Sequence, residues 1–197
     1  MADALTTELD AVNIILGAIG EAPVSTLAGT LPVDVSVAYA CLTELRKRIL
    51  SSGWNCNTED DVQLALDGSN HAVIPPTALK VTLSDGDAGR STYDIVQRGT
   101  QLYDKKNHTY VFTRAPKCNI VYLLTWDELP EQLRAYVALK AARVNQSRTI
   151  GSPELAGFTQ MDEMELLVIW READADGAKY NLFNNADSAR FYQYRRA

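Results

Sequence analysis

Few residues of this chain are suited to nucleophilic catalysis. The histidines, His71 and His108, lie in segments rich in turn-forming residues, and no serine or cysteine nearby has a recognisable nucleophile setting. Ser152 stands in the sequence GSPEL, which lacks the strand-turn-helix frame of a nucleophile elbow and fits a helix cap followed by proline. A catalytic triad is therefore not indicated.

Paired carboxylates are the remaining enzymatic option. A glycoside hydrolase needs two acidic side chains roughly 5 to 9 Å apart across the sugar bond. Asp60 with Asp61, or Asp127 with Glu128, would supply such a pair. Helix capping and solvated charge are the competing interpretation of both pairs. A glycan-degrading hydrolase is kept as the alternative function.

No metal or cofactor site is predicted. Residues 84–91 (SDGDAGRS) have two aspartates, Asp85 and Asp87, but lack the third oxygen ligand and the final glutamate of a calcium loop, so a flexible solvated loop is expected. The glycines do not form a phosphate-binding loop. Cys41, Cys56 and Cys118 are far apart and without CxxC spacing, which indicates free thiols.

Charge is distributed unevenly between two predicted helices. Residues 154–176 carry seven acids and one base, Arg171, whereas residues 131–148 are mainly basic. The two helices pair within one subunit, or copies in a ring meet acidic face to basic face; both interpretations stay open. The ring-interface or channel candidates are Arg134, Lys140, Arg143, Arg148, Asp162, Glu163, Glu165 and Glu172.

The end of the chain, residues 184–197 (NNADSARFYQYRRA), mixes aromatic and basic side chains. Such residues are enriched at protein interfaces, so we expect an arm that docks on a partner. A frayed tail and a short single-strand nucleic-acid binder are the alternatives. The partner-binding candidates are Arg190, Phe191, Tyr192, Tyr194, Arg195 and Arg196.

The sequence predicts four helices, two before the strand-rich segment and two after it. The spacing predicts the first from about Thr7 to Ile19, and a second that begins at Pro32 and stops at Gly53. A third begins at Pro130 and ends near Arg148, and a fourth follows Ser152 after a short loop that makes the two antiparallel. The predicted apolar stripe of the fourth helix is Leu155, Phe158, Met161, Met164, Leu167, Val168 and Arg171.

Between the helix pairs the periodicity changes to that of strands. Residues 54–126 are rich in Thr, Tyr and Val in short runs separated by turns, which predicts an inserted antiparallel β meander. Residues 100–113 (TQLYDKKNHTYVFT) alternate on both sides of KKNH and are expected to form a hairpin. The fold class is α+β: an antiparallel four-helix core of residues 1–53 and 127–180, the β subdomain 54–126, and a C-terminal arm 181–197.

Length and composition agree with a protein that has a real core. The chain has 197 residues, 46% of them hydrophobic, and a formal net charge of −6. That charge argues against tight wrapping of nucleic acid, because phosphate affinity comes from Lys and Arg. No apolar run is long enough to span a bilayer and the N-terminus is acidic, so we expect a chain that is cytoplasmic when made.

Four blocks together carry a family resemblance. They are residues 11–27 (AVNIILGAIGEAPVSTL), 51–59 (SSGWNCNTE), 126–158 (WDELPEQLRAYVALKAARVNQSRTIGSPELAGF) and 179–183 (KYNLF). In this order they resemble the tail tubular protein A family of short-tailed bacteriophages, the head-to-tail adaptors. None of these blocks is a catalytic signature; they are packing and punctuation patterns.

The resemblance implies a structural virion protein located in the tail. In that family twelve copies form a ring between the portal protein of the capsid and the tail nozzle, tail tubular protein B, with contacts to the tail fibre protein. Double-stranded DNA would pass through without specific binding during ejection. An acidic helix lining the channel would repel phosphates weakly, and reversing its acids to Lys without slowing ejection would contradict that hypothesis.

Overall fold

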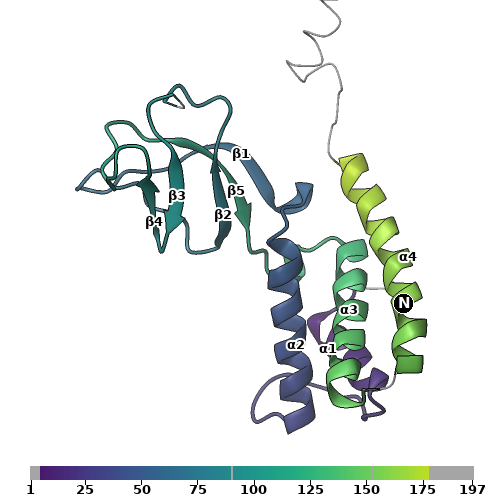
Figure 1. Cartoon of the computed structure of the whole chain (residues 1–197). Coiled ribbons are helices and arrows are strands. Elements are labelled where there is room, and N and C mark those ends of the chain that lie inside the picture. The colour runs from purple at the N-terminus through teal and green to yellow at the C-terminus, as the bar shows by residue number, and fades with distance from the viewer. Residues whose placement is uncertain (1–4, 90, 152, 178–197) are drawn as a thin grey trace, which may run out of the picture.

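Helices build one end of the molecule and strands build the other (Figure 1). The computed structural model describes residues 5–89, 91–151 and 153–177. Helices α1 (Glu8–Ala18) and α2 (Val33–Leu50) precede the strands, and α3 (Glu131–Thr149) and α4 (Pro153–Gly177) follow them. Helix α3 packs against each of the other three, and α2 and α4 run in the same direction on either side of it. The predicted α+β class is confirmed.

The helix boundaries follow the capping and turn residues of the sequence. The Thr7 hydroxyl accepts the Asp10 N–H and the Asp10 carboxylate accepts the Thr7 N–H, a capping box that begins α1. Helices α2 and α3 begin directly after Pro32 and Pro130. After α2 the chain turns at Gly53, whose φ of 81° favours glycine. These boundaries match the predicted ones to within a few residues.

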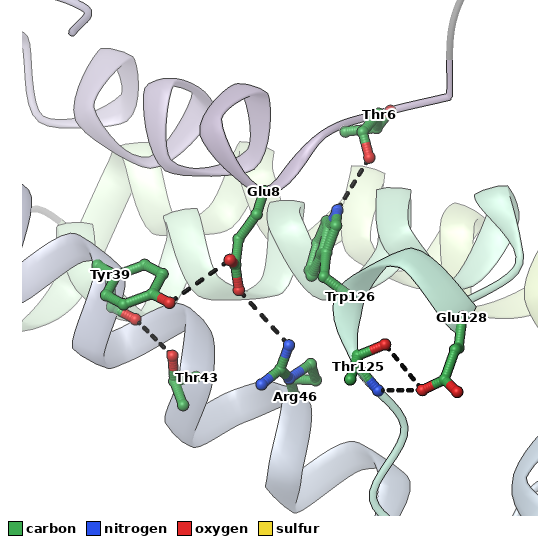
Figure 2. A network of polar contacts seen from close by, with 8 residues as sticks. All are labelled: Thr6, Glu8, Tyr39, Thr43, Arg46, Thr125, Trp126 and Glu128. Carbon is green, nitrogen blue, oxygen red and sulfur yellow. Dashed lines mark hydrogen bonds and ion pairs between the residues drawn. The ribbon is translucent and has the colours of Figure 1, made fainter. Parts of the chain in front are cut away.

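One hydrophobic core joins the four helices and fixes the N-terminal segment. Trp126 is buried in it and donates its Nε1–H to the Thr6 carbonyl at 2.9 Å (Figure 2). Close by, the Glu8 carboxylate lies 3.4 Å from the Tyr39 hydroxyl and 3.5 Å from Arg46 Nη1 (Figure 2). The most completely buried side chains of this core include Ile15, Leu16, Leu42, Leu45, Leu50, Leu133, Val137 and Trp170.

The strands form two small antiparallel sheets rather than the predicted meander. Strand β5 (Lys117–Tyr122) lies between β1 (Thr58–Gln63) and β2 (Ala78–Leu83), and β3 (Ile95–Arg98) pairs with β4 (Gln101–Asp104). The last strand is therefore central. The meander order is wrong here: β5 has a neighbour on each side, and three of its six residues, Cys118, Ile120 and Val121, are buried. A second core, which includes Leu102, Cys118 and Ile120, underlies these sheets.

The hairpin predicted across residues 100–113 is also wrong in its pairing. Its first half, β4, pairs with β3 through a tight turn in which Gly99 has a φ of 61°. Only one bridge, from Asp104 to Thr109, crosses the KKNH loop in the described chain. The buried Asp104 carboxylate accepts N–H groups of Asp94 and Lys106 and so folds this loop back on itself.

A single amide holds the junction between helices and strands. Asn57 is 2% exposed and donates its Nδ2 hydrogens to the carbonyls of Leu50, at 3.0 Å, and Tyr122, at 2.7 Å. Its Oδ1 accepts the Trp54 N–H at 2.8 Å. The outgoing and the returning segments of the chain are therefore fastened to one side chain.

Candidate functional site

A groove lies between α2, α3 and α4 on one face of the helical core. It has a volume of about 590 Å³. Apolar side chains from all three helices form its floor, and four cations line it. The floor includes Leu45, Ile49, Val144 and Leu167, and the cations are Arg48, Lys140, Arg143 and Arg171. Such a groove suits an amphipathic partner that carries acidic groups.

Two of the predicted candidates on α3 form ion pairs with one carboxylate of the same subunit. The Glu163 carboxylate of α4, only 10% exposed, lies 3.0 Å from Lys140 Nζ and accepts a short hydrogen bond from Arg143 Nε. Burial alone would raise the pKa of the Glu163 carboxyl, but these hydrogen bonds outweigh it and hold the pKa below its ordinary value. For this trio the structure supports pairing inside one subunit.

Lys140 is held in place from its other side as well. Its Nζ donates to the Tyr136 hydroxyl at 2.8 Å and lies 5.2 Å from the centre of that ring. Burial would lower the pKa of the Lys140 ammonium, but the bonds to Tyr136 and Glu163 outweigh it and raise that pKa. Lys140 therefore keeps its charge and forms one fixed wall of the groove.

Arg134 is removed from the ring-interface candidates. Its side chain is 4% exposed and donates from Nε, Nη1 and Nη2 to the carbonyls of Leu129, Thr6 and Asp127 at 2.8 to 3.0 Å. A guanidinium has donors in a fixed fork, which matches three converging carbonyls. Arg134 therefore joins the N-terminal segment to the start of α3, and its donors are used within the subunit.

Arg148 lies at the other end of α3, on the surface. Its guanidinium binds Glu44 of α2 through both Nη atoms, at 2.9 and 3.1 Å. Both side chains are about half exposed, so the pair is solvated. Of the four basic candidates on α3, Lys140 and Arg143 thus line the groove, Arg148 is paired on the surface and Arg134 is buried.

The outward face of α4 is both apolar and acidic. Met161, Met164 and Val168 are 73%, 57% and 53% exposed, and Glu165 and Glu172 are exposed on the same side. We call these five residues the α4 ridge. Asp162 is also exposed on α4.

The predicted apolar stripe of α4 is partly wrong about which residues face the core. Three of its predicted core residues face outward, while Trp170 and Glu163 are buried instead. Trp170 packs edge to face on Trp54, with ring centres 5.4 Å apart. A tryptophan buries more apolar area than a methionine. The face of α4 that carries Trp170 therefore packs against the core. The side chains of Leu155 and Phe158, and Ser152 itself, lie outside the described residues.

An aromatic cluster on the strands was not predicted. Tyr103 and Tyr110 pack edge to face with ring centres 4.9 Å apart, and His71 packs edge to face with Tyr110 at 6.3 Å. The Arg98 guanidinium lies 3.6 Å from the Tyr103 ring centre. Tyr, His and Arg grouped at a partly exposed surface are typical of a protein interface. The signal was present in the two tyrosines that flank the KKNH loop.

The structure gives the predicted carboxylate pairs structural partners. Glu128 accepts the N–H and the hydroxyl of Thr125, each at 2.7 Å, and these bonds hold its pKa below the ordinary value. A general acid needs a raised pKa. Asp61 accepts a short hydrogen bond from the Ser84 hydroxyl, while Asp60 and Asp127 are exposed. Glu128 thus caps the 3₁₀ helix Trp126–Glu128 (η2) rather than α3.

The loop with the two aspartates is not the solvated loop that was expected. Asp87 is 4% exposed, and its carboxylate accepts the Tyr93 hydroxyl and the N–H groups of Gly89 and Lys117, all at 2.6 Å. Burial would raise the pKa of Asp87, but these bonds outweigh it and lower that pKa. This carboxylate organises the loop. Within the described ranges no three acidic, histidine or cysteine side chains gather as a metal site would require.

Comparison with known proteins identifies the family. The model of a family described as tail tubular protein matches residues 9–180. The chain belongs to the tail tubular protein family. Tail tubular protein A of Klebsiella phage KP34 is 30% identical over 167 residues, which are 84% of this chain and 86% of that protein. The resemblance in the sequence blocks is thereby confirmed, and the protein is a structural component of a phage tail.

Two observations complete the description of this tail tubular family member. Among the described residues, no helix combines the length and the apolar character needed to cross a membrane. The six partner-binding candidates of the C-terminal arm, Arg190, Phe191, Tyr192, Tyr194, Arg195 and Arg196, lie outside the described residues.

Proposed function

We propose that the protein is a ring-forming adaptor between the capsid portal and the tail nozzle. The observation that carries this proposal is the family match, which spans residues 9–180 and so includes both the helical core and the strands. The resemblance to tail tubular protein A implies twelve copies in the ring. A ring requires two different surfaces on each subunit, and the chain offers a cationic groove and an acidic ridge.

The strands and the C-terminal arm are proposed to bind the other tail components. The cluster of Arg98, Tyr103, Tyr110 and His71 lies on the strands, away from the helical core, and has the composition of an interface. The arm of residues 181–197 would bind an adjoining ring. Together they would contact tail tubular protein B and the tail fibre protein. Weak single contacts suffice because many copies act together.

The ring is proposed to form part of the channel for DNA. Double-stranded DNA must pass without being retained, and a net charge of −6 does not favour phosphate binding over the molecule as a whole. Exposed acids of α4 outside the ridge, such as Asp162, would repel the duplex weakly if they faced the channel.

The test is the mass of the purified chain in solution, alone and with isolated portal rings, by light scattering. We expect a monomer or small oligomer that joins the portal in a stoichiometric complex. A stable monomer that ignores portal rings overturns the proposal. Incubation of the same protein with host capsule, with Asp127→Asn and Glu128→Gln as controls, would then test glycan cleavage.

A further inference from the structure

We propose that the α4 ridge of one subunit docks in the groove between α2, α3 and α4 of the next copy. The partner is thus a second copy of this chain. The inference rests on the proposed ring and names the contact that would close it.

The groove carries positive charge that the subunit itself does not balance. Lys140 and Arg143 share the single carboxylate of Glu163. Arg48 and Arg171 form no ion pair in the part of the chain that the structure describes. Glu44 attracts Arg48 but is shared with Arg148, so the four lining cations still outnumber the acids that interact with them, Glu163 and Glu44. An occupant with carboxylates would be attracted, and one with arginines repelled.

The ridge has the complementary pattern. Positions 161, 164, 165, 168 and 172 are spaced by three and four residues, so they line one side of the helix over three turns. Three of them are apolar and two are acidic. An amphipathic helix lies in a groove through anchors at this spacing, and methionines adapt well to an irregular floor. Glu165 and Glu172 form no ion pair among the described residues.

The two surfaces can be used at the same time. No residue of the ridge lines the groove, which takes only Leu167 and Arg171 from α4. A contact between different surfaces of identical copies is heterologous, and it repeats until the rotation closes a ring. The groove of one subunit and the ridge of the same subunit would thus serve two different neighbours.

Charge distinguishes this occupant from the arm of the same chain. Residues 184–197 contain Arg190, Arg195 and Arg196 against Asp187. A net positive segment is repelled by a groove that already has uncompensated arginines. The ridge supplies the opposite sign, and its exposed apolar area gains from burial.

Charge reversal on both surfaces gives a direct test. The ridge variant is Glu165→Arg with Glu172→Arg, and the groove variant is Arg48→Glu with Arg171→Glu. A control, Glu21→Arg with Asp60→Arg, changes net charge by the same amount and sign as the ridge variant at two exposed positions outside both surfaces. Circular dichroism and thermal unfolding verify that each variant folds. Light scattering then measures how the full chain joins portal rings.

We expect each reversed variant alone to need at least roughly tenfold more protein than wild type or the control to reach full stoichiometry, because like charges then meet. An equal mixture of the ridge and groove variants is expected to recover, since each ridge then finds a groove of opposite sign. A chain with all four substitutions should recover for the same reason.

Three results would overturn the inference while the ring function stands. In the first, wild type joins portal and both variants join equally well. In the second, only the groove variant fails, which indicates another occupant such as the C-terminal arm. In the third, both variants fail and neither the mixture nor the fourfold variant recovers, which assigns the charges to portal or DNA. Wild type that does not join portal at all contradicts the proposed function itself.

Discussion

Glu163 and Glu165 lie two residues apart on α4 and have opposite surroundings. Glu163 is buried between Lys140 and Arg143, whereas Glu165 is exposed beside methionines. The inner and outer faces of the helix are both mixtures of apolar and acidic side chains. The two faces of α4 differ in what they contact. The inner face packs against α3, which supplies the cations Lys140 and Arg143, and the outer face is exposed in the subunit. A helix whose two faces look alike in sequence is suited to have two partners.

The largest expected difference in the free energy of unfolding is between an apolar residue on the inner face of α4 and one on the outer face. Trp170→Ala should lower the free energy of unfolding by about 3 to 5 kcal/mol, because it leaves a cavity beside Trp54. Met164→Ala, on the ridge, should change it by no more than about 0.5 kcal/mol. Urea unfolding followed by far-UV circular dichroism measures both. Equal losses would show that the assignment of the faces is mistaken.

A second variant at the same position separates packing from hydrogen bonding. Trp170 Nε1 is buried and has no hydrogen-bond partner among the described residues. Trp170→Phe removes that unsatisfied donor and keeps most of the ring, so it should cost clearly less than Trp170→Ala. A loss as large as that of the alanine variant would point to a missing partner for the indole.

The next difference concerns the two glutamates. Glu163→Gln should cost about 2 kcal/mol, because it leaves two half-buried cations without their carboxylate. Glu165→Gln is the matched control and should leave unfolding unchanged within about 0.5 kcal/mol. The same urea titration at neutral pH compares them. A larger loss for Glu165→Gln than for Glu163→Gln would contradict the comparison.

At acidic pH, Glu163 should no longer contribute to the free energy of unfolding. Its folded-state pKa lies below the ordinary 4.5, so the unfolded chain binds the proton more readily. The stabilisation is therefore complete above that value and is lost as pH falls through the folded-state pKa. Unfolding of wild type and Glu163→Gln, followed from about pH 7 to about pH 3, should converge at the acid end. A gap that stays constant would assign the effect to shape rather than charge.

The smallest effect is expected at the surface pair of Arg148 and Glu44. Both side chains are about half exposed, and solvated ion pairs contribute little. Arg148→Gln should leave the thermal midpoint unchanged within error, at low and at high salt. A clear drop that salt removes would mean that this pair belongs with the inner contacts of α3.

Much of the helical core could be predicted because its signals are local. Pro32, Pro130 and Gly53 act on the backbone within a few residues, so helix boundaries followed directly. The antiparallel arrangement of α3 and α4 follows from a short loop. The family, too, could be recognised from the order of such local patterns, and the comparisons confirm it.

What could not be predicted depends on partners distant in sequence. Arg134 has the spacing of a surface residue, yet three carbonyls from residues 6, 127 and 129 bury it. The strand order depends on which strand is covered on both sides, and β5 comes last in the chain. The groove is made by three helices at once, and Arg48 and Arg171, which line it, are 123 positions apart. No local pattern contains this information.

The Asn57 amide has a mechanical consequence. It binds the carbonyl where α2 ends and the carbonyl where β5 ends, so both covalent connections between the two cores meet at one rigid point. A pull on the strands is passed through these hydrogen bonds to the ends of the helices rather than absorbed by a loose linker. We therefore expect the strands and the helices to move together under load, because the Asn57 side chain ties the two connections to each other.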